Sequence, residues 1–311
     1  MRRRGGFTLV ELLIGTLLAS VMGLVLITWG RWFLLVFNRS SCWLLAYERG
    51  QRVLAFIESK VLRTGLGLSA CREDAALRQA FARGVYNAPS VSRLLTVYQD
   101  KPTLMTPVTE EDGVFRGTAL GLLCAYPSGL MARRSDGDAE VTPGATINFT
   151  LLSGDVKLSR SGFQAGYIRD LASWCALPLA GMPFYITSAS TRKLSLTLAS
   201  TVGLPISVPP VNELYLLQYA RFCVLNGQLC FQQMDSAWSP LYPREEGVLA
   251  LWVEWRPELR VLDLWVLTSG GPALFGGAAR LHDWPPEAPW RDDFGQHTLC
   301  VARASWRLRN L

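Results

Sequence analysis

Histidine, the side chain that most often carries acid–base chemistry at neutral pH, is nearly absent from this chain and occurs twice in 311 residues. His282 lies among prolines and tryptophans, where a surface histidine is more typical than a general base. His297 and Cys300 are separated by two residues but lack the second ligand pair of a zinc site. No G-x-S-x-G, P-loop or dinucleotide-binding fingerprint occurs. We therefore expect no catalytic residues, no metal centre and no enzymatic activity.

Calcium is a weaker alternative, raised by two short acidic stretches. Asp112-Gly113 and Asp136-Gly137-Asp138 contain carboxylates beside glycine, but neither has the full ligand spacing of an EF-hand loop. Aspartate followed by glycine is more typical of a turn. We expect no other cofactor.

Charge is also sparse, at 18% of residues against 50% hydrophobic residues, which excludes general disorder. The net charge of +6 suggests nucleic-acid binding until its location is considered, because Arg2, Arg3 and Arg4 supply half of it. The remaining charges are scattered singly, as on a solvated surface. Nucleic acid therefore stays an uncertain partner.

A long apolar run follows the three arginines and extends from Phe7 to Thr28 with a single charge, at Glu11. As a helix rising ~1.5 Å per residue it is roughly 33 Å long, enough to cross the hydrocarbon core of a bilayer. The arginines favour a cytoplasmic N-terminus, and Trp29, Arg31 and Trp32 follow where interfacial residues belong. The pattern predicts a single membrane span with the rest of the chain exported.

A cleavable secretory signal is the main competing interpretation, since Ala19-Ser20 offers small residues for a signal peptidase. Two observations argue against it: the apolar run continues past Ser20, and it contains Glu11. A carboxylate inside a membrane helix is unfavourable by on the order of 2–3 kcal/mol at the centre and less near an end, so it usually has a partner. Glu11 is therefore a candidate functional residue.

These N-terminal residues resemble a known signal. The sequence Gly6-Phe7-Thr8-Leu9-Val10-Glu11 is similar to the class III signal of type IV prepilins and type II secretion pseudopilins. The resemblance implies that a prepilin peptidase cuts between Gly6 and Phe7 and then methylates the amine of Phe7. It also implies that Glu11 faces the N-terminal amine of a neighbouring subunit, neutralising two charges in an apolar setting.

An amphipathic stretch continues the helix after the apolar run. Between Cys42 and Gly65, apolar residues recur at helical spacing and charged residues occupy the other side; the apolar positions are Leu45, Val53, Phe56, Ile57 and Val61. Gly65 and Gly67 are suitable to end the helix. We predict a leader at 1–6, a helix at 7–65 with a membrane half and an amphipathic half, and an exported β-rich domain at 66–311.

The rest of the chain alternates strand-like stretches with glycine- and proline-containing loops, which predicts an α+β fold with an antiparallel sheet packed on the helix, as in pilins. The expected strands are Arg93–Tyr98, Ala145–Leu152, Phe184–Ser188, Lys193–Leu198, Glu213–Leu225, Gln228–Met234, Val248–Trp255, Leu259–Thr268 and Leu299–Leu308. We expect exposed loops at Asp100–Arg116 and Arg133–Gly144.

One hairpin is predicted in more detail. Asn226-Gly227 fits a two-residue type I′ turn, and counting outward from it places Cys223 opposite Cys230. The pair is close enough for a disulfide, although it is a hydrogen-bonded pair, which has the wider spacing. Two inward-facing apolar thiols are the equal alternative. The six cysteines after Cys42 permit 15 pairings, so the sequence does not fix the connectivity.

Tryptophans are frequent after residue 237, and burial in the sheet explains most of them. Trp284 and Trp290, which lie beside prolines, are expected to be the most exposed.

Weaker similarity extends into the exported part. The helix end at Gln51–Gly67, the hairpin, the strand after Glu246-Gly247 and the last residues, Ser305–Asn310, resemble PilW-type minor pilins and J-type pseudopilins; residues 100–210 resemble neither. The resemblance implies a subunit that initiates or caps a type IV pilus-like filament, first held in the inner membrane with its C-terminal domain in the periplasm. Implied partners are other pilin subunits, the assembly platform and membrane lipid. A tip adhesin or DNA-uptake protein and a single-span exported enzyme remain alternatives.

Overall fold

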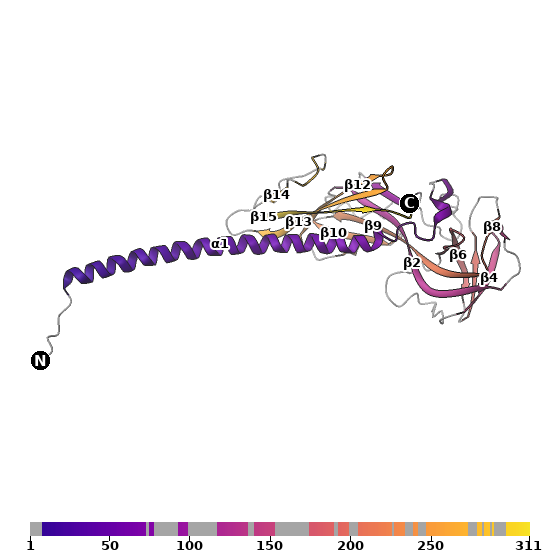
Figure 1. The fold of residues 1–311 in the computed structure, drawn as a ribbon, viewed down its shortest axis with the longest axis horizontal. Helices are drawn as coiled ribbons and strands as arrows, with labels where there is room; N and C mark the ends of the chain where they lie inside the picture. The colour runs from indigo at the N-terminus through magenta and orange to yellow at the C-terminus, as the bar shows by residue number, and fades with distance from the viewer. Residues whose placement is uncertain are drawn as a thin grey trace.

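The long helix and the sheets beside it are seen in a computed structural model (Figure 1). The structure describes residues 8–72, 75–77, 93–98, 117–135, 140–152, 174–189, 192–198, 205–225, 227–233, 239–241, 247–272, 279–281, 283–286, 288 and 297–311. Helix α1, Leu9–Val61, projects from the rest of the molecule for about half of its length. Its C-terminal half lies against β-structure. We call the whole β-rich part of the molecule, with all the described strands, the head.

The helix is continuous through both halves because its sequence contains no proline and is rich in leucine. Its buried positions begin only in the second half and follow helical spacing: Ala46, Gly50, Val53, Leu54, Ile57 and Val61. The chain then turns through Gly65 and Gly67, whose φ values are +70° and +71°. The end lies close to the predicted end. Leu45, predicted to face the core, is exposed, and its neighbour Ala46 takes the buried position.

A four-stranded sheet forms the surface on which α1 packs. Its order is β12 (Val248–Arg256), β13 (Val261–Pro272), β15 (His297–Arg307) and β14 (Ala279–Arg280), with β14 parallel to β15 and the other pairs antiparallel. The helix contacts β13 and β15. Alternate residues of β13, including Leu262, Leu264 and Val266, face the helix.

The other strands near the helix belong to a second sheet. It contains β1 (Leu95–Tyr98), β2 (Ala119–Arg134), β9 (Val211–Leu225), β10 (Gln228–Gln233) and β11 (Ser239–Pro240). Residues of β2 and β9, such as Leu122 and Phe222, share one hydrophobic cluster with Ile57 of the helix and Val253 of β12. The C-terminal half of α1 is therefore covered by side chains from both sheets.

Beyond the end of the helix, six strands form a closed ring. The ring runs β2, β4 (Thr146–Leu151), β7 (Lys193–Thr197), β6 (Met182–Ala189), β5 (Trp174–Leu177), β9 and back to β2, each strand antiparallel to the next. All six contribute to one buried cluster, in which Phe149, Trp174 and Phe184 are the largest fully buried side chains. This small barrel has a core of its own. A short 3-10 helix, η1 (Ser69–Cys71), adds Cys71 to it.

Strands β2 and β9 are the two long strands that run from the sheet near the helix into the barrel. At the bend, Ser128 donates its hydroxyl hydrogen to the carbonyl oxygen of Leu214 (2.6 Å), and the register of β2 shifts between Pro127 and Met131. Gly129 has a φ of +71°, which glycine adopts readily. A separate two-stranded sheet pairs β3 (Glu140–Val141) with β8 (Ile206–Ser207).

The mixed α+β composition and the antiparallel sheets are as predicted, and each of the nine expected strands overlaps an observed one. Strands β2 and β5 and the two-residue strands β3, β8, β11 and β14 were not predicted. The exposed loop expected at 133–144 is partly wrong, because Arg133 and Arg134 belong to β2 and Glu140 and Val141 form β3. The loop predicted at 100–116 lies outside the described residues.

Candidate functional site: the N-terminal helix and its junction with the sheets

The helix begins with a reciprocal cap between Thr8 and Glu11. The Glu11 amide donates to the Thr8 hydroxyl oxygen (3.3 Å), while the Thr8 amide and hydroxyl each donate to Oε2 of Glu11 (2.9 Å). This capping box satisfies amides that the first helical turn would otherwise leave unpaired. Glu11 therefore has partners within its own chain, an arrangement that the S/T-x-x-E spacing at Thr8 could have predicted. Gly6 and Phe7 lie outside the described residues.

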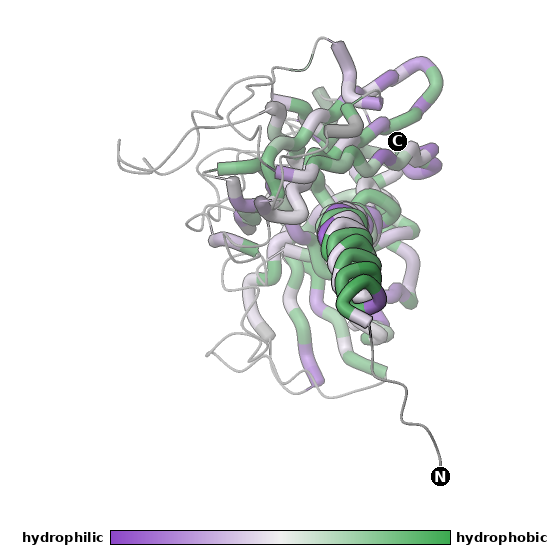
Figure 2. Tube along the Cα trace, turned by 90° about the vertical axis from the view of Figure 1, so that its left-hand side faces the viewer, coloured by the Kyte–Doolittle hydropathy of each residue, from purple (hydrophilic) through white to green (hydrophobic). Residues whose placement is uncertain are grey.

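From Leu9 to Leu34, α1 has no buried side chain. Its leucines, isoleucines and valines are more than half exposed, and no other described segment covers them. Viewed from the N-terminal side, the helix is mostly green, the colour of hydrophobic residues (Figure 2). By length and composition this helix can cross a membrane. The structure thus contains one candidate span or signal anchor among its described residues, in agreement with the predicted anchor.

The junction between helix and head is a close approach of small residues. A Cβ added at Gly50 would lie 2.6 Å from the Cβ of Ala302, and one added at Gly270 would overlap the backbone of Cys42. Two hydrogen bonds fix the approach. The Thr268 hydroxyl donates to the carbonyl oxygen of Ala46 (2.7 Å). A guanidinium nitrogen of Arg49 donates to the carbonyl oxygen of Ser269 (2.5 Å). The close approach explains why alanine rather than Leu45 faces the sheet.

Farther along the helix, aromatic rings and cations replace the small residues. Phe56 packs edge-on against Phe222 and Phe231, with ring centroids 5.9 and 6.2 Å away. In the last turn and just after it, the Lys60 ammonium and the Arg63 guanidinium lie 4.8 and 4.7 Å from the ring centroid of Tyr126. Burial lowers the pKa of Lys60. Both cations are placed to stabilise the negative end of the helix dipole and the ring face.

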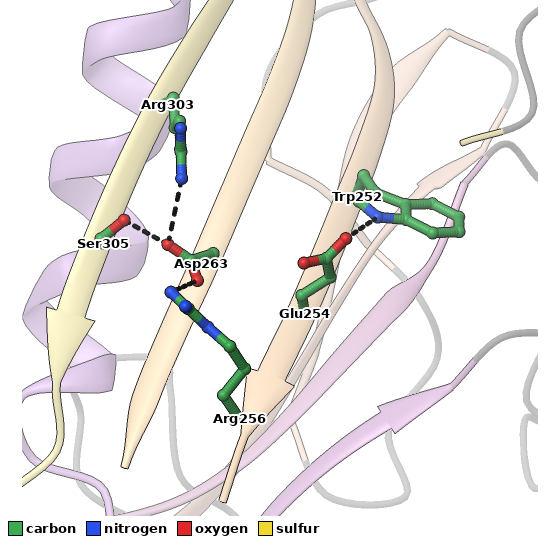
Figure 3. Close-up of polar contacts among 6 residues, drawn as sticks. All are labelled: Trp252, Glu254, Arg256, Asp263, Arg303 and Ser305. Atoms are coloured by element: carbon green, nitrogen blue, oxygen red, sulfur yellow. Dashed lines mark hydrogen bonds and ion pairs between the residues drawn. The ribbon is translucent and has the colours of Figure 1, made fainter. Parts of the chain in front are cut away.

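On the opposite face of the helix-bound sheet, a buried carboxylate joins three strands (Figure 3). Asp263 of β13 accepts hydrogen bonds from Arg256 of β12 and Ser305 of β15, and Arg303 of β15 lies 3.6 Å away. The Asp263 side chain is 2% exposed, whereas the arginines are 49% and 53% exposed. The cluster is an ion-paired crosslink between strands.

A carboxylate and two cations meet in this cluster, as they can in a catalytic centre. Burial acts to raise the pKa of Asp263, but the hydrogen bonds from Ser305 and Arg256 and the two guanidinium charges outweigh burial and lower it. An acid with a lowered pKa and its oxygens already bonded is a poor proton donor or nucleophile. The neighbouring Glu254 accepts a hydrogen bond from the indole of Trp252 (3.2 Å). The arrangement of the polar side chains around Asp263 therefore supports the stability of the sheet rather than catalysis.

The cysteines are thiols in the structure. The predicted register is confirmed, because Cys223 lies directly opposite Cys230, and of the two alternatives left open for this pair the structure has two thiols rather than a disulfide. Both side chains pack in one apolar cluster with Ala119 and Leu225, as inward-facing thiols do. Burial raises the pKa of Cys71 and of Cys124 to about 12, so neither is a ready nucleophile.

Of the remaining histidines, tryptophans and calcium candidates considered from the sequence, some lie within the described residues and others do not. His297 accepts or donates a hydrogen bond with Ser269 (2.7 Å), and no metal-like group of three His, Cys, Asp or Glu side chains occurs among the described residues. The calcium candidates, at Asp112-Gly113 and 136–138, lie outside them, as do His282 and Trp290. Trp284 is buried against Leu249 and Leu267, so its predicted exposure was wrong.

Comparisons with known protein families, with curated proteins and with solved structures find no match to this chain. The sequence and the geometry above are therefore the basis for assigning a function. Both point to α1 as the functional element. Its first half is apolar and uncovered, its N-terminus is capped by Thr8 and Glu11, and its second half packs closely against the sheets.

Proposed function

We propose that this chain is a minor pilin or pseudopilin that helps to initiate or cap a type IV pilus-like filament. The observation that carries the proposal is the division of α1. One half is apolar and uncovered, as a lipid-embedded or filament-embedded segment must be, and the other half is fixed on an antiparallel sheet. The N-terminal motif around Gly6 and Glu11 adds the processing signal that such subunits carry.

The barrel supports a place at the end of a filament rather than in its shaft. In Figure 1 it lies beyond the C-terminal end of α1, along the same long axis. If subunits stack with their helices parallel to the filament axis, a barrel in that place occupies the space of the next subunit along. A subunit at the tip meets no such obstruction.

Glu11 would exchange its partners during assembly. In the isolated chain its carboxylate is bonded to the backbone and hydroxyl of Thr8. In a filament the amine of a neighbouring Phe7 would supply a positive charge, and a buried carboxylate gains most from a charged partner. The pairing would fix the register between subunits more than it would add stability.

Processing is tested by replacing Gly6 with leucine in the producing cell and measuring the intact mass of the protein. The wild type is expected to begin at methylated Phe7, while Gly6→Leu should remain uncleaved because the bulky side chain keeps the scissile bond from the peptidase. Gly5→Leu is the matched control and should still be cut. A wild-type chain that begins near residue 20 or at Met1 would overturn the proposal.

The role of Glu11 is tested with a pair of substitutions. Glu11→Ala removes both the charge and the cap, whereas Thr8→Ala removes only the cap's hydroxyl and leaves the carboxylate. Both variants should be cut, but only Glu11→Ala should lose most incorporation into sheared filaments or cross-linked subunit complexes. Equal loss in the two variants would assign Glu11 to capping alone.

The barrel also favours a second candidate, a tip protein for adhesion or DNA uptake, because the end of the molecule away from the proposed membrane segment is available to an external ligand. DNA binding by the detergent-solubilised chain that weakens steeply with salt would support it. An exported enzyme is the least favoured candidate, since the carboxylate cluster at Asp263 is already saturated by its partners.

A further inference from the structure

The apolar surface of α1 does not end where a minimal membrane span would end. The uncovered hydrophobic side chains continue past Thr28 to Phe37. We call residues 29–37 the collar; its exposed apolar members are Trp29, Trp32, Phe33, Leu34, Val36 and Phe37. Phe33 and Phe37 are each 61% exposed, and their rings stack with centroids 6.2 Å apart. So much aromatic surface needs a cover other than water.

The distribution of these side chains around the helix indicates what covers them. Residues 33–37 read Phe-Leu-Leu-Val-Phe, and successive helical residues are about 100° apart, so five in a row occupy every side. A partner helix buries one stripe and leaves the opposite side polar. An apolar surface on all sides matches a surrounding solvent of the same kind, which is lipid.

The length of the apolar surface agrees. Residues 9–37 form roughly 43 Å of helix, which spans about 40 Å along the membrane normal at a typical tilt of about 20°. The hydrocarbon core measures about 30 Å, and the bilayer with both headgroup regions about 40–45 Å. Tryptophans and arginines are common in the headgroup region, where Arg31 and Arg39 can extend their guanidinium groups to phosphate.

The position of the head follows from the first contacts between helix and sheet. The carbonyl group of Cys42 lies against Gly270, and Leu35 and Asn38 shortly before it are partly covered. We infer that, before assembly, the collar lies in the outer headgroup region of the membrane, so that the base of the head at Cys42 and Gly270 rests at the lipid surface. This inference rests on the proposed membrane anchor and extends it from Thr28 to Phe37.

Cysteine accessibility tests the inference on the full-length chain in proteoliposomes with outward-facing heads. In a Cys42→Ser background, which removes the one native cysteine that is not buried, single cysteines replace Thr28, Phe33, Phe37 or Ser41. All four positions are exposed, so the substitutions leave the packing of the head intact. A membrane-impermeant maleimide should label positions 28, 33 and 37 at least tenfold more slowly than position 41, with detergent-denatured protein as the reference for full labelling.

The other outcomes separate the inference from the proposal on which it rests. Labelling of 33 and 37 as fast as 41, with 28 protected, would overturn the collar and keep the anchor. Rapid labelling of 28 as well would overturn the anchor itself. Protection of 33 and 37 that disappears when vesicles are diluted to about one chain each would assign the collar to a partner helix and also overturn the inference.

Discussion

The two halves of α1 have the same secondary structure and opposite surroundings. Ile14 in the first half is 54% exposed, whereas Ile57 in the second is fully buried between the two sheets. Gly30 has open space around it, while Gly50 touches Ala302. The Thr28 hydroxyl donates a hydrogen bond within the helix, to the carbonyl oxygen of Leu24. The Thr268 hydroxyl donates from β13 to the helix, at the carbonyl oxygen of Ala46. One continuous helix therefore serves as a free apolar segment and as part of a packed core, and matched substitutions can measure the difference.

The largest expected effect comes from the isoleucine pair. Ile57→Ala leaves a cavity where the helix meets both sheets and should destabilise the head by about 3 kcal/mol. Ile14→Ala, which deletes the same atoms in the uncovered half, should leave the stability of the head unchanged. Urea unfolding of the detergent-solubilised protein, followed by tryptophan fluorescence, gives both values. Equal effects would mean that the halves do not differ as described.

The glycine pair tests the close approach itself. Gly50→Ala places a methyl group against Ala302 and should destabilise the head by about 2 kcal/mol, because the tight contact forces the helix away from the sheet. Gly30→Ala should leave the head unaffected and favour the helix by somewhat less than about 1 kcal/mol. The double variant Gly50→Ala with Ala302→Gly should recover part of the loss in the same unfolding assay.

The sheet face turned away from α1 gives a smaller, pH-dependent effect. Because the pKa of Asp263 is lowered in the folded state, its stabilisation is fully present above the ordinary value of 3.8 and is lost as the pH falls through the folded value. Asp263→Asn should cost about 1.5 kcal/mol at pH 7, reduced from a fully buried pair because the arginines are half exposed. The difference from wild type should shrink below pH 3.8. A constant difference down to pH 2 would exclude the ion pairs as its cause.

The smallest effect belongs to the threonines. Thr268→Val removes the hydroxyl that bonds Ala46 and should destabilise the head by about 1 kcal/mol. Thr28→Val removes a comparable hydroxyl, which bonds Leu24 within the uncovered half, and should leave the head unchanged. Thermal unfolding of the two variants side by side is sufficient, and a larger shift for Thr28→Val would contradict the comparison.

Much of this fold was readable from periodicity, because the helix and nine strands have strong local patterns. The register of the hairpin at Cys223 and Cys230 followed from two turn residues. Strand β2 was missed because Pro127, Ser128 and Gly129 resemble a turn, and in the structure they form a bulge inside a long strand. The closed ring was out of reach of the sequence, since it depends on pairings such as β5 with β9 that are distant along the chain.

The candidate site was predicted unevenly for a similar reason. Glu11 was identified because a charge in an apolar run is conspicuous, and its partner Thr8 is three residues away. The junction was not identified, because no pattern around Ala46 or Gly50 indicates a contact with Thr268 or Gly270, which lie more than 200 residues later. Glycine and alanine residues that allow a close approach have no distinctive sequence pattern, and their role is seen only when the structure shows what they touch.

The closure of the six strands limits how the far end of the molecule can meet other proteins. Around a ring, each strand already has a backbone neighbour on both sides, so an incoming extended peptide finds no free row of amides and carbonyls to join. Recognition on the ring itself therefore has to use side chains. On the outward side of β4 and β7 these are polar, with Asn148, Thr150 and Lys193 exposed to solvent.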